Sequence, residues 1–128
     1  MKRRLFLALL LAAILTSAGA ASAATFGVLI TPTSTTGATT PVDSGGATQV
    51  FVHCWRHDNA AASTTLVYLQ GSIDKVHWKD LATFQNVTGM NATTGAGGDG
   101  VSVVSWPWMR VYISDLSVGT LDCIWMKR

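Results

Sequence analysis

The most constraining feature of the sequence is the stretch from Leu66 to Phe84, which predicts two β-strands joined by a structured turn. Its first five residues are rich in β-forming side chains, and a Gly-Ser pair ends that run. Asp74 can accept a hydrogen bond from the backbone two residues later, and Trp78 opens a second apolar segment. A hairpin with this turn commits the chain to a β architecture.

Other short segments of β-forming residues are separated by turn residues along the whole chain. The predicted strands lie at residues 26–31, 48–57, 66–70, 78–84, 101–106, 108–114 and 120–126. Glu is absent from residues 24–128, and no run of good helix formers has a helical period, which argues against a long helix. The sequence therefore predicts an all-β fold, an antiparallel β-sandwich of jelly-roll or immunoglobulin-like type with about 6–8 short strands.

The hairpin also contains a short motif. Gly71, Ser72, Asp74, Trp78 and Leu81 form the pattern Gly-Ser-x-Asp-x-x-x-Trp-x-x-Leu, which Val67 and Leu69 precede and Pro107, Arg110 and Val111 follow. Together these residues resemble a small β-sandwich module found in phage tail and virion structural proteins, over residues 49–126 of this chain. The resemblance implies a sandwich fold and a structural role.

The first 23 residues have the three regions of a secretory signal peptide. Basic residues 2–4 precede an apolar run over residues 5–15, and the small residues that follow end in Ala21-Ser22-Ala23. The apolar run is shorter than the roughly 20 residues that span a bilayer as a helix. We expect cleavage after Ala23, so that the protein is secreted, periplasmic or at the cell surface, without a membrane anchor.

Loss of residues 1–23 leaves 105 of the 128 residues, enough for one domain. It also removes three of the nine basic residues, and the six that remain face seven acidic residues, for a formal charge of −1. The basic character of the precursor therefore belongs to the leader, and we expect no nucleic-acid partner.

Residues 24–48 differ in composition from the rest. From residue 31 onward they are almost all Thr, Ser, Gly, Ala and Pro, which offer little side-chain area to bury. We expect an extended N-terminal arm over residues 24–48, with a possible first strand at 26–31, and a sandwich domain over residues 49–128.

The chain has two cysteines, Cys54 and Cys123, and both lie in predicted strands. Strand alternation places both sulfur atoms on the faces that point toward the core. Because an exported chain meets oxidising conditions, we predict a disulfide between them. Two buried free thiols are the alternative.

Four residues suggest a metal site: His53, His57, Asp58 and His77. Imidazole and carboxylate groups suit zinc. However, His53 and His57 are four residues apart on one strand, which separates them by roughly 13 Å. We therefore expect no metal and no cofactor; a site made of His57, Asp58 and a residue from another loop is the alternative.

No set of catalytic residues is recognisable in the sequence. Most Asp residues lie at predicted turns, where local hydrogen bonding explains them, and no nucleophile-elbow pattern is present. We expect no catalytic residue and no enzymatic activity.

Five tryptophans are many for one small domain. Trp78 and Trp125 are expected in the core. The predicted interaction face consists of Trp55, Tyr68, Trp106, Trp108 and Tyr112. Exposed aromatic rings suit either a protein interface or stacking on sugar rings, and packing of the arm or loops over them is the structural alternative.

The sequence thus predicts an exported, non-catalytic β-sandwich that acts as a structural, assembly or surface-interaction module, with protein partners or copies of itself. The alternative is a carbohydrate-binding module that holds a polysaccharide on Trp55, Trp106 and Trp108. A small secreted enzyme is the third hypothesis.

Overall fold

The computed structural model describes residues 24–57, 64–89, 97–117 and 119–128, and all regular elements within them are β-strands. The strands are β1 (Thr25–Thr33), β2 (Gly37–Ala38), β3 (Val42–Asp43), β4 (Gln49–Arg56), β5 (Thr65–Ser72), β6 (Lys79–Gln85), β7 (Asp99–Val104), β8 (Trp108–Leu116) and β9 (Leu121–Lys127). The predicted signal peptide lies outside the described residues. Within them, no helix has the length and apolar character needed to cross a bilayer.

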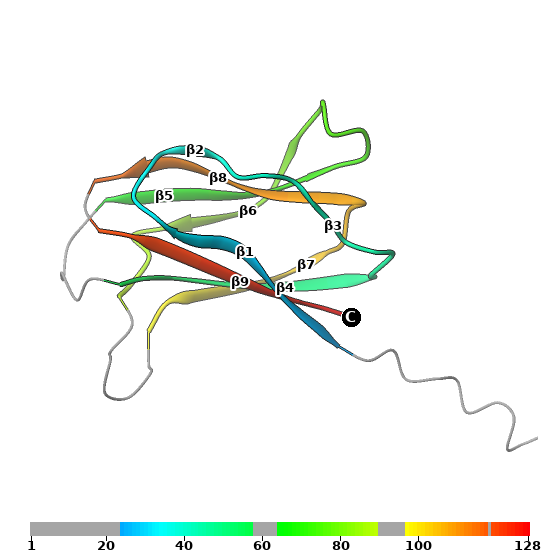
Figure 1. Cartoon of the computed structure of the whole chain (residues 1–128), viewed down its shortest axis with the longest axis horizontal. Helices are drawn as coiled ribbons and strands as arrows, with labels where there is room; N and C mark the ends of the chain where they lie inside the picture. The colour runs from blue at the N-terminus through cyan, green and yellow to red at the C-terminus, as the bar shows by residue number, and fades with distance from the viewer. Residues whose placement is uncertain (1–23, 58–63, 90–96, 118) are drawn as a thin grey trace, which may run out of the picture.

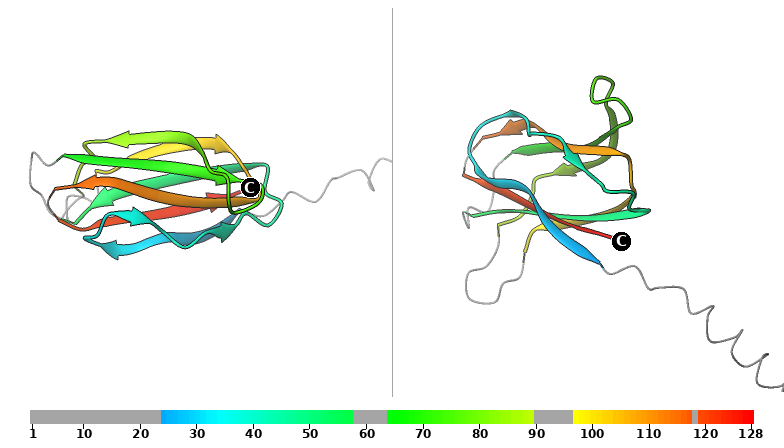
Figure 2. Two further views of the ribbon diagram at one scale, coloured as in Figure 1. Left: turned by 90° about the horizontal axis from the view of Figure 1, so that it is seen from above. Right: turned by 45° about the vertical axis from the view of Figure 1, so that its right-hand side comes forward.

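Two antiparallel sheets pack face to face (Figure 1). Sheet A has the strand order β1-β9-β4-β7, and sheet B has the order β2-β8-β5-β6, with β3 also paired to β8. Seen from above, the strands of both sheets run in roughly the same direction (Figure 2). This is the aligned packing of a β-sandwich, and the predicted fold class is confirmed.

The strand pairs are nested around one turn. β5 pairs with β6, β4 with β7, the interrupted strand β2/β3 with β8, and β1 with β9. A long hairpin folded over itself gives this order, which is that of a jelly roll. The immunoglobulin-like topology does not apply, because its last two strands share a sheet, whereas β8 and β9 lie in different sheets here.

The core lies between the sheets and is filled by alternate residues of each strand. Its fully buried members include Val50 and Val52 of β4, Val67 and Leu69 of β5, Met109, Val111 and Ile113 of β8, and Leu121 of β9. Trp125 is 7% exposed and lies across β1 at Gly27, where any Cβ would collide with the indole. Its predicted place in the core is confirmed.

Residues 24–48 form three strands: β1 covers the possible strand at 26–31, whereas the extended arm predicted for this segment is not observed. β1 pairs with β9 along its length, and its Leu29 side chain is 6% exposed in the core. β2 and β3 pair with the free edge of β8. Backbone hydrogen bonds to an open strand edge need no large side chain, so a segment rich in Thr and Gly can still join a sheet.

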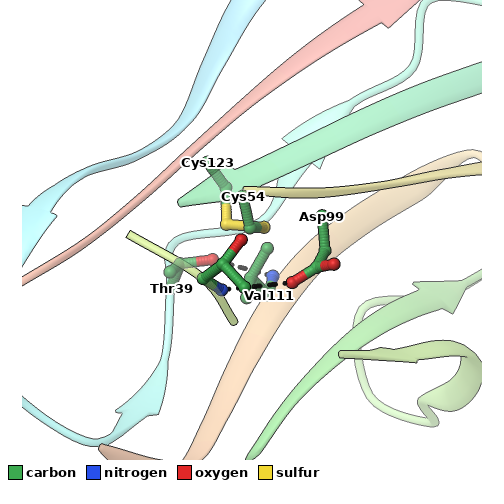
Figure 3. Close-up of a disulfide and its surroundings, with 6 residues drawn as sticks. Thr39, Cys54, Asp99, Val111 and Cys123 are labelled. Carbon is green, nitrogen blue, oxygen red and sulfur yellow. Dashed lines mark hydrogen bonds between the residues drawn. A yellow bond between two sulfur atoms is a disulfide. The ribbon is translucent and has the colours of Figure 1, made fainter. Parts of the chain in front are cut away.

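A disulfide joins Cys54 of β4 to Cys123 of β9 (Figure 3). The two residues are directly opposite one another in sheet A, with their alpha carbons 4.1 Å apart, and neither side chain is exposed. The predicted pairing is confirmed in the structure. The bond links neighbouring strands of one sheet and closes a chain segment of 69 residues.

Removing this bond should lower the free energy of unfolding by about 4 kcal/mol, the chain-entropy value for a loop of this length. The variant Cys54→Ala/Cys123→Ala and the reduced wild-type protein should both show the loss in urea unfolding. Reductant should have no effect on the variant. An unchanged unfolding midpoint after full reduction would contradict the prediction.

Candidate functional site

The five residues of the predicted interaction face lie on three different parts of the sandwich. Trp55 is on the outer side of sheet A, whereas Tyr68, Trp108 and Tyr112 are on the outer side of sheet B. Trp106, in the corner between β7 and β8, packs against the core. The expectation of one aromatic surface is wrong, because the outer sides of packed sheets face opposite directions. The three tryptophans of the expected sugar platform are likewise separated.

Two tryptophans occupy positions that strand alternation does not predict. Trp106 is half-buried above Gly71, where a Cβ would lie 2.6 Å from the indole Cγ. Trp78, expected in the core, lies at the end of the turn over residues 73–78, with the Arg110 Cζ 4.0 Å from its ring centroid. Its indole N–H donates to the carbonyl of Lys75 at 3.2 Å.

The outer side of sheet B carries a polar aromatic face, made of Tyr68, Gln70, Trp108, Arg110 and Tyr112. Tyr68 and Tyr112 are directly opposite on β5 and β8, with stacked rings whose centroids are 6.3 Å apart. Arg110 Nε donates to Gln70 Oε1 at 2.8 Å. Partial burial lowers the pKa of the Arg110 guanidinium, which nevertheless stays charged at neutral pH.

The turn over residues 73–78 joins β5 to β6 and projects from sheet B (Figures 1 and 2). The Ser72 hydroxyl accepts hydrogen bonds from the backbone N–H groups of Asp74 at 3.2 Å and Lys75 at 2.9 Å. Asp74 Oδ1 accepts from the N–H groups of Val76 at 2.9 Å and His77 at 2.8 Å. Two side chains therefore satisfy four consecutive backbone N–H groups of the turn, those of residues 74–77.

Lys75 stands at the tip of this turn with a φ of 64°, in the left-handed region. Its Nζ lies 3.4 Å from the centroid of the Trp108 ring, so the Lys75 side chain reaches back to the polar aromatic face. The turn motif predicted from the sequence lies at this end of the sheet: Gly71, Ser72, Asp74 and Trp78.

Asp74 is the carboxylate on which the turn depends. Its Oδ2 lies 2.7 Å from Nδ1 of His77. This side-chain hydrogen bond, and then the backbone N–H groups of His77 and Val76, hold the pKa of the Asp74 carboxyl well below its usual range. The folded turn therefore keeps Asp74 ionised at pH values where the unfolded chain begins to bind protons.

The outer side of sheet A is a candidate contact surface that the sequence analysis missed. We call it the apolar face and define it by Phe26, Val28, Phe51, Ile124 and Met126. Phe26 is 74% exposed and Val28 is 58% exposed, and Phe51 and Ile124 each expose more than a third of their surface. An antiparallel sandwich usually turns polar side chains to water, so this face is unusual.

A hollow of about 390 Å³ opens on the apolar face. Its walls include Phe26, Phe51 and Ile124, and two small residues of β7, Gly100 and Ser102, also line it. Strand alternation in β4 does predict that Phe51 points outward. The surface could not be recognised because β1, which supplies its most exposed side chains, was assigned to an arm.

The histidines of the suspected metal site are in separate places. His57 Nε2 pairs with Asp122 Oδ2 at the end of sheet A, His53 Nε2 lies 3.2 Å from the carbonyl of Gly97, and His77 pairs with Asp74 in the turn. Among the described residues, no three His, Cys, Asp or Glu side chains are grouped so that they could hold a metal ion. Asp58 lies outside the described residues.

The lowered pKa of Asp74 predicts a pH-dependent contribution to stability. The contribution is fully present above the unfolded value near 4 and declines as the pH falls toward the lower folded value. Wild-type protein should therefore have a higher melting temperature than Asp74→Asn at pH 6. This difference in melting temperature should narrow between about pH 4 and pH 2. Thermal unfolding across this range measures it, with Asp115→Asn as an exposed control. A gap that is constant with pH would contradict the assignment.

Comparisons with known proteins find a likeness in structure. No protein-family model and no curated protein matches the sequence. A matching solved structure is the crystal structure of the SPBc2 prophage-derived protein YomS, at a TM-score of 0.57 and 8% identity, over 82% of this chain and 92% of that chain. At this identity the likeness shows the fold alone. A β-rich phage protein therefore shares the fold of this chain.

Proposed function

We propose that this protein is an exported, non-catalytic structural jelly roll that works by contact with other protein subunits. The observation that carries the proposal is the apolar face on the outer side of sheet A. Full burial of one Phe or Val side chain is worth about 1.5–3 kcal/mol, so leaving several of them in water is costly unless another surface covers them. Exposed apolar patches of this kind mark interaction sites.

A phage-type structural role is the setting that we favour. The hairpin motif resembles modules of tail and virion proteins, and the fold is shared with a prophage-derived protein. Jelly rolls also serve as capsid subunits, although they serve as sugar-binding domains too, so the fold alone does not decide the function. The contact surface makes assembly the better proposal.

Export is part of the proposal because two features support it independently. The first 23 residues have the composition of a cleavable leader. The disulfide between Cys54 and Cys123 is of a kind that persists in oxidising compartments and is rare in the cytosol. Either feature alone would be weaker support.

The assembly proposal predicts that the chain is found in large particles in extracts that combine the cells and the medium into which they export it. Phe51→Lys places a charge in the middle of the apolar face and should move the chain to slowly sedimenting fractions, with an unchanged melting temperature. Val76→Lys, at a similarly apolar but separate position in the turn, should sediment as wild type does. Wild-type protein that already sediments slowly in these extracts would refute the assembly proposal.

Polysaccharide binding remains the second candidate, and one observation favours it. The stacked rings of Tyr68 and Tyr112 lie beside the hydrogen-bonding side chains of Gln70 and Arg110. Aromatic rings flanked by such groups suit a sugar ring. A sugar site would therefore lie on the polar aromatic face and would not use Trp55 or Trp106.

Retention on insoluble polysaccharides separates the two candidates. Under the assembly proposal, wild-type protein and Tyr112→Ala should both pass through a panel of immobilised polysaccharides. Retention of wild type and of Phe51→Lys, together with loss of retention for Tyr112→Ala, would instead establish the sugar-binding function.

A further inference from the structure

The apolar face is built from two rows of residues that cross all four strands of sheet A. One row runs from β1 to β7 through Phe26, Met126, Phe51 and Ser102. The next row runs through Val28, Ile124, His53 and Gly100. Each row is a set of direct cross-strand neighbours, so side chains of one row stand side by side on the same surface.

Both rows end on β7 in their smallest side chain. The rows begin on β1 with Phe26 and Val28, which are the most exposed side chains of the face, and end on β7 with Ser102 and Gly100, which line the hollow. Within these two rows the face is therefore high at β1 and low at β7, whereas Val104, the next outward residue of β7, is 75% exposed. A flat partner would leave the low edge uncovered.

A second copy of the same face fits this shape in one orientation. Rotation by 180° about an axis in the interface and parallel to the strands places β1 of one copy over β7 of the other. Phe26 then meets Ser102 of the second copy, and Val28 meets Gly100. Rotation about an axis across the strands would instead stack β1 on β1 and leave both hollows empty.

The charge distribution permits the contact between identical faces. Neither row contains an Asp, Glu, Lys or Arg. Beyond the rows, Asp122 on the outer side of β9 is already paired with His57, and the exposed Arg128 follows Met126 after the end of β9. His53 is the one ionisable side chain within the two rows, so the rows themselves meet without repulsion between like carboxylates, ammonium or guanidinium groups, which would otherwise oppose an isologous contact.

The area is sufficient for a modest dimer. Four strands of about seven residues span roughly 19 by 23 Å at the usual strand spacings. Since the accessible surface of a corrugated face exceeds its projection, two such faces bury on the order of 1,000 Å², near the lower limit for a specific interface. The contact would extend the two-layer sandwich to four layers.

We propose that the protein forms a two-fold symmetric dimer through the apolar face, with Phe26 of each copy seated over Ser102 of the other and Val28 over Gly100. The inference rests on the proposed function as a structural module and names the partner of its contact surface. The protein is a building unit of two chains, whose polar aromatic faces lie on the two outer sides.

Opposite charges introduced at the two edges of the apolar face test this geometry. Phe26→Lys and Ser102→Glu, made separately, should each raise the dissociation constant of the dimer at least tenfold in sedimentation of the purified exported protein. The double variant should recover at least tenfold in low salt and lose the recovery in high salt, because each new cation faces a new anion of the other copy. Within one chain the two positions are three strand spacings, roughly 14 Å, apart, too far to pair.

The controls make each outcome decisive. Ile73→Lys, which replaces an equally exposed apolar residue in the turn, should leave the dimer unchanged. A dimer without recovery in the double variant overturns the proposed axis, and a wild-type monomer at all concentrations overturns the dimer. If the protein is a monomer and its intact mass shows that residues 1–23 are retained, the leader would be assigned to the apolar face in place of a second copy. This result would also overturn the dimer. In either monomer case, sedimentation in native extracts still decides the assembly proposal separately.

Discussion

The nested pairing of strands around the turn at residues 73–78 is the constraint on which the rest of the structure depends. Each pair lies outside the previous one, from β5 with β6 to β1 with β9. At the centre, side-chain oxygen atoms of Ser72 and Asp74 accept hydrogen bonds from four backbone N–H groups of the turn. The turn thereby fixes the register of the first pair, and the pleat then decides which residues of every later strand face the core.

The disulfide and the tryptophans complete what the pairing begins. The bond between Cys54 and Cys123 crosses from the second strand pair to the outermost one, at the point where β4 and β9 lie side by side. Trp125 and Trp106 fill space above glycines of neighbouring strands, Gly27 and Gly71. An aromatic ring above a strand glycine restores packing that the missing side chain would leave out. This explains two of the five tryptophans without a ligand.

Local patterns in the sequence predict the strands and the inward faces well. Alternation in β4 correctly buries Val50 and Cys54, and it also turns Arg56 inward, where a charged residue is not expected; Arg56 is 2% exposed. The disulfide follows from the same parity. These features depend on neighbours along the chain, which a period of two residues reports directly.

What the sequence did not predict depends on which strands become neighbours. Residues 31–48 look unable to fold because their side chains are small, but the backbone of β2 and β3 finds an open edge at β8. The apolar face combines residues of β1, β4 and β9, and no single strand shows it. The predicted aromatic surface failed for the same reason, since Trp55 and Trp108 belong to different sheets.

The position of β9 has a consequence for how the chain can be made. β9 is the last strand, yet it lies inside sheet A between β1 and β4, and it contributes Cys123 to the disulfide. Sheet A therefore cannot close before β9 is in place, because until then β1 and β4 have no common neighbour. Pairing of β5 with β6 in sheet B does not depend on β9. The two layers of the sandwich thus differ in when they can be completed: sheet A waits for a strand that lies far from β1 along the chain.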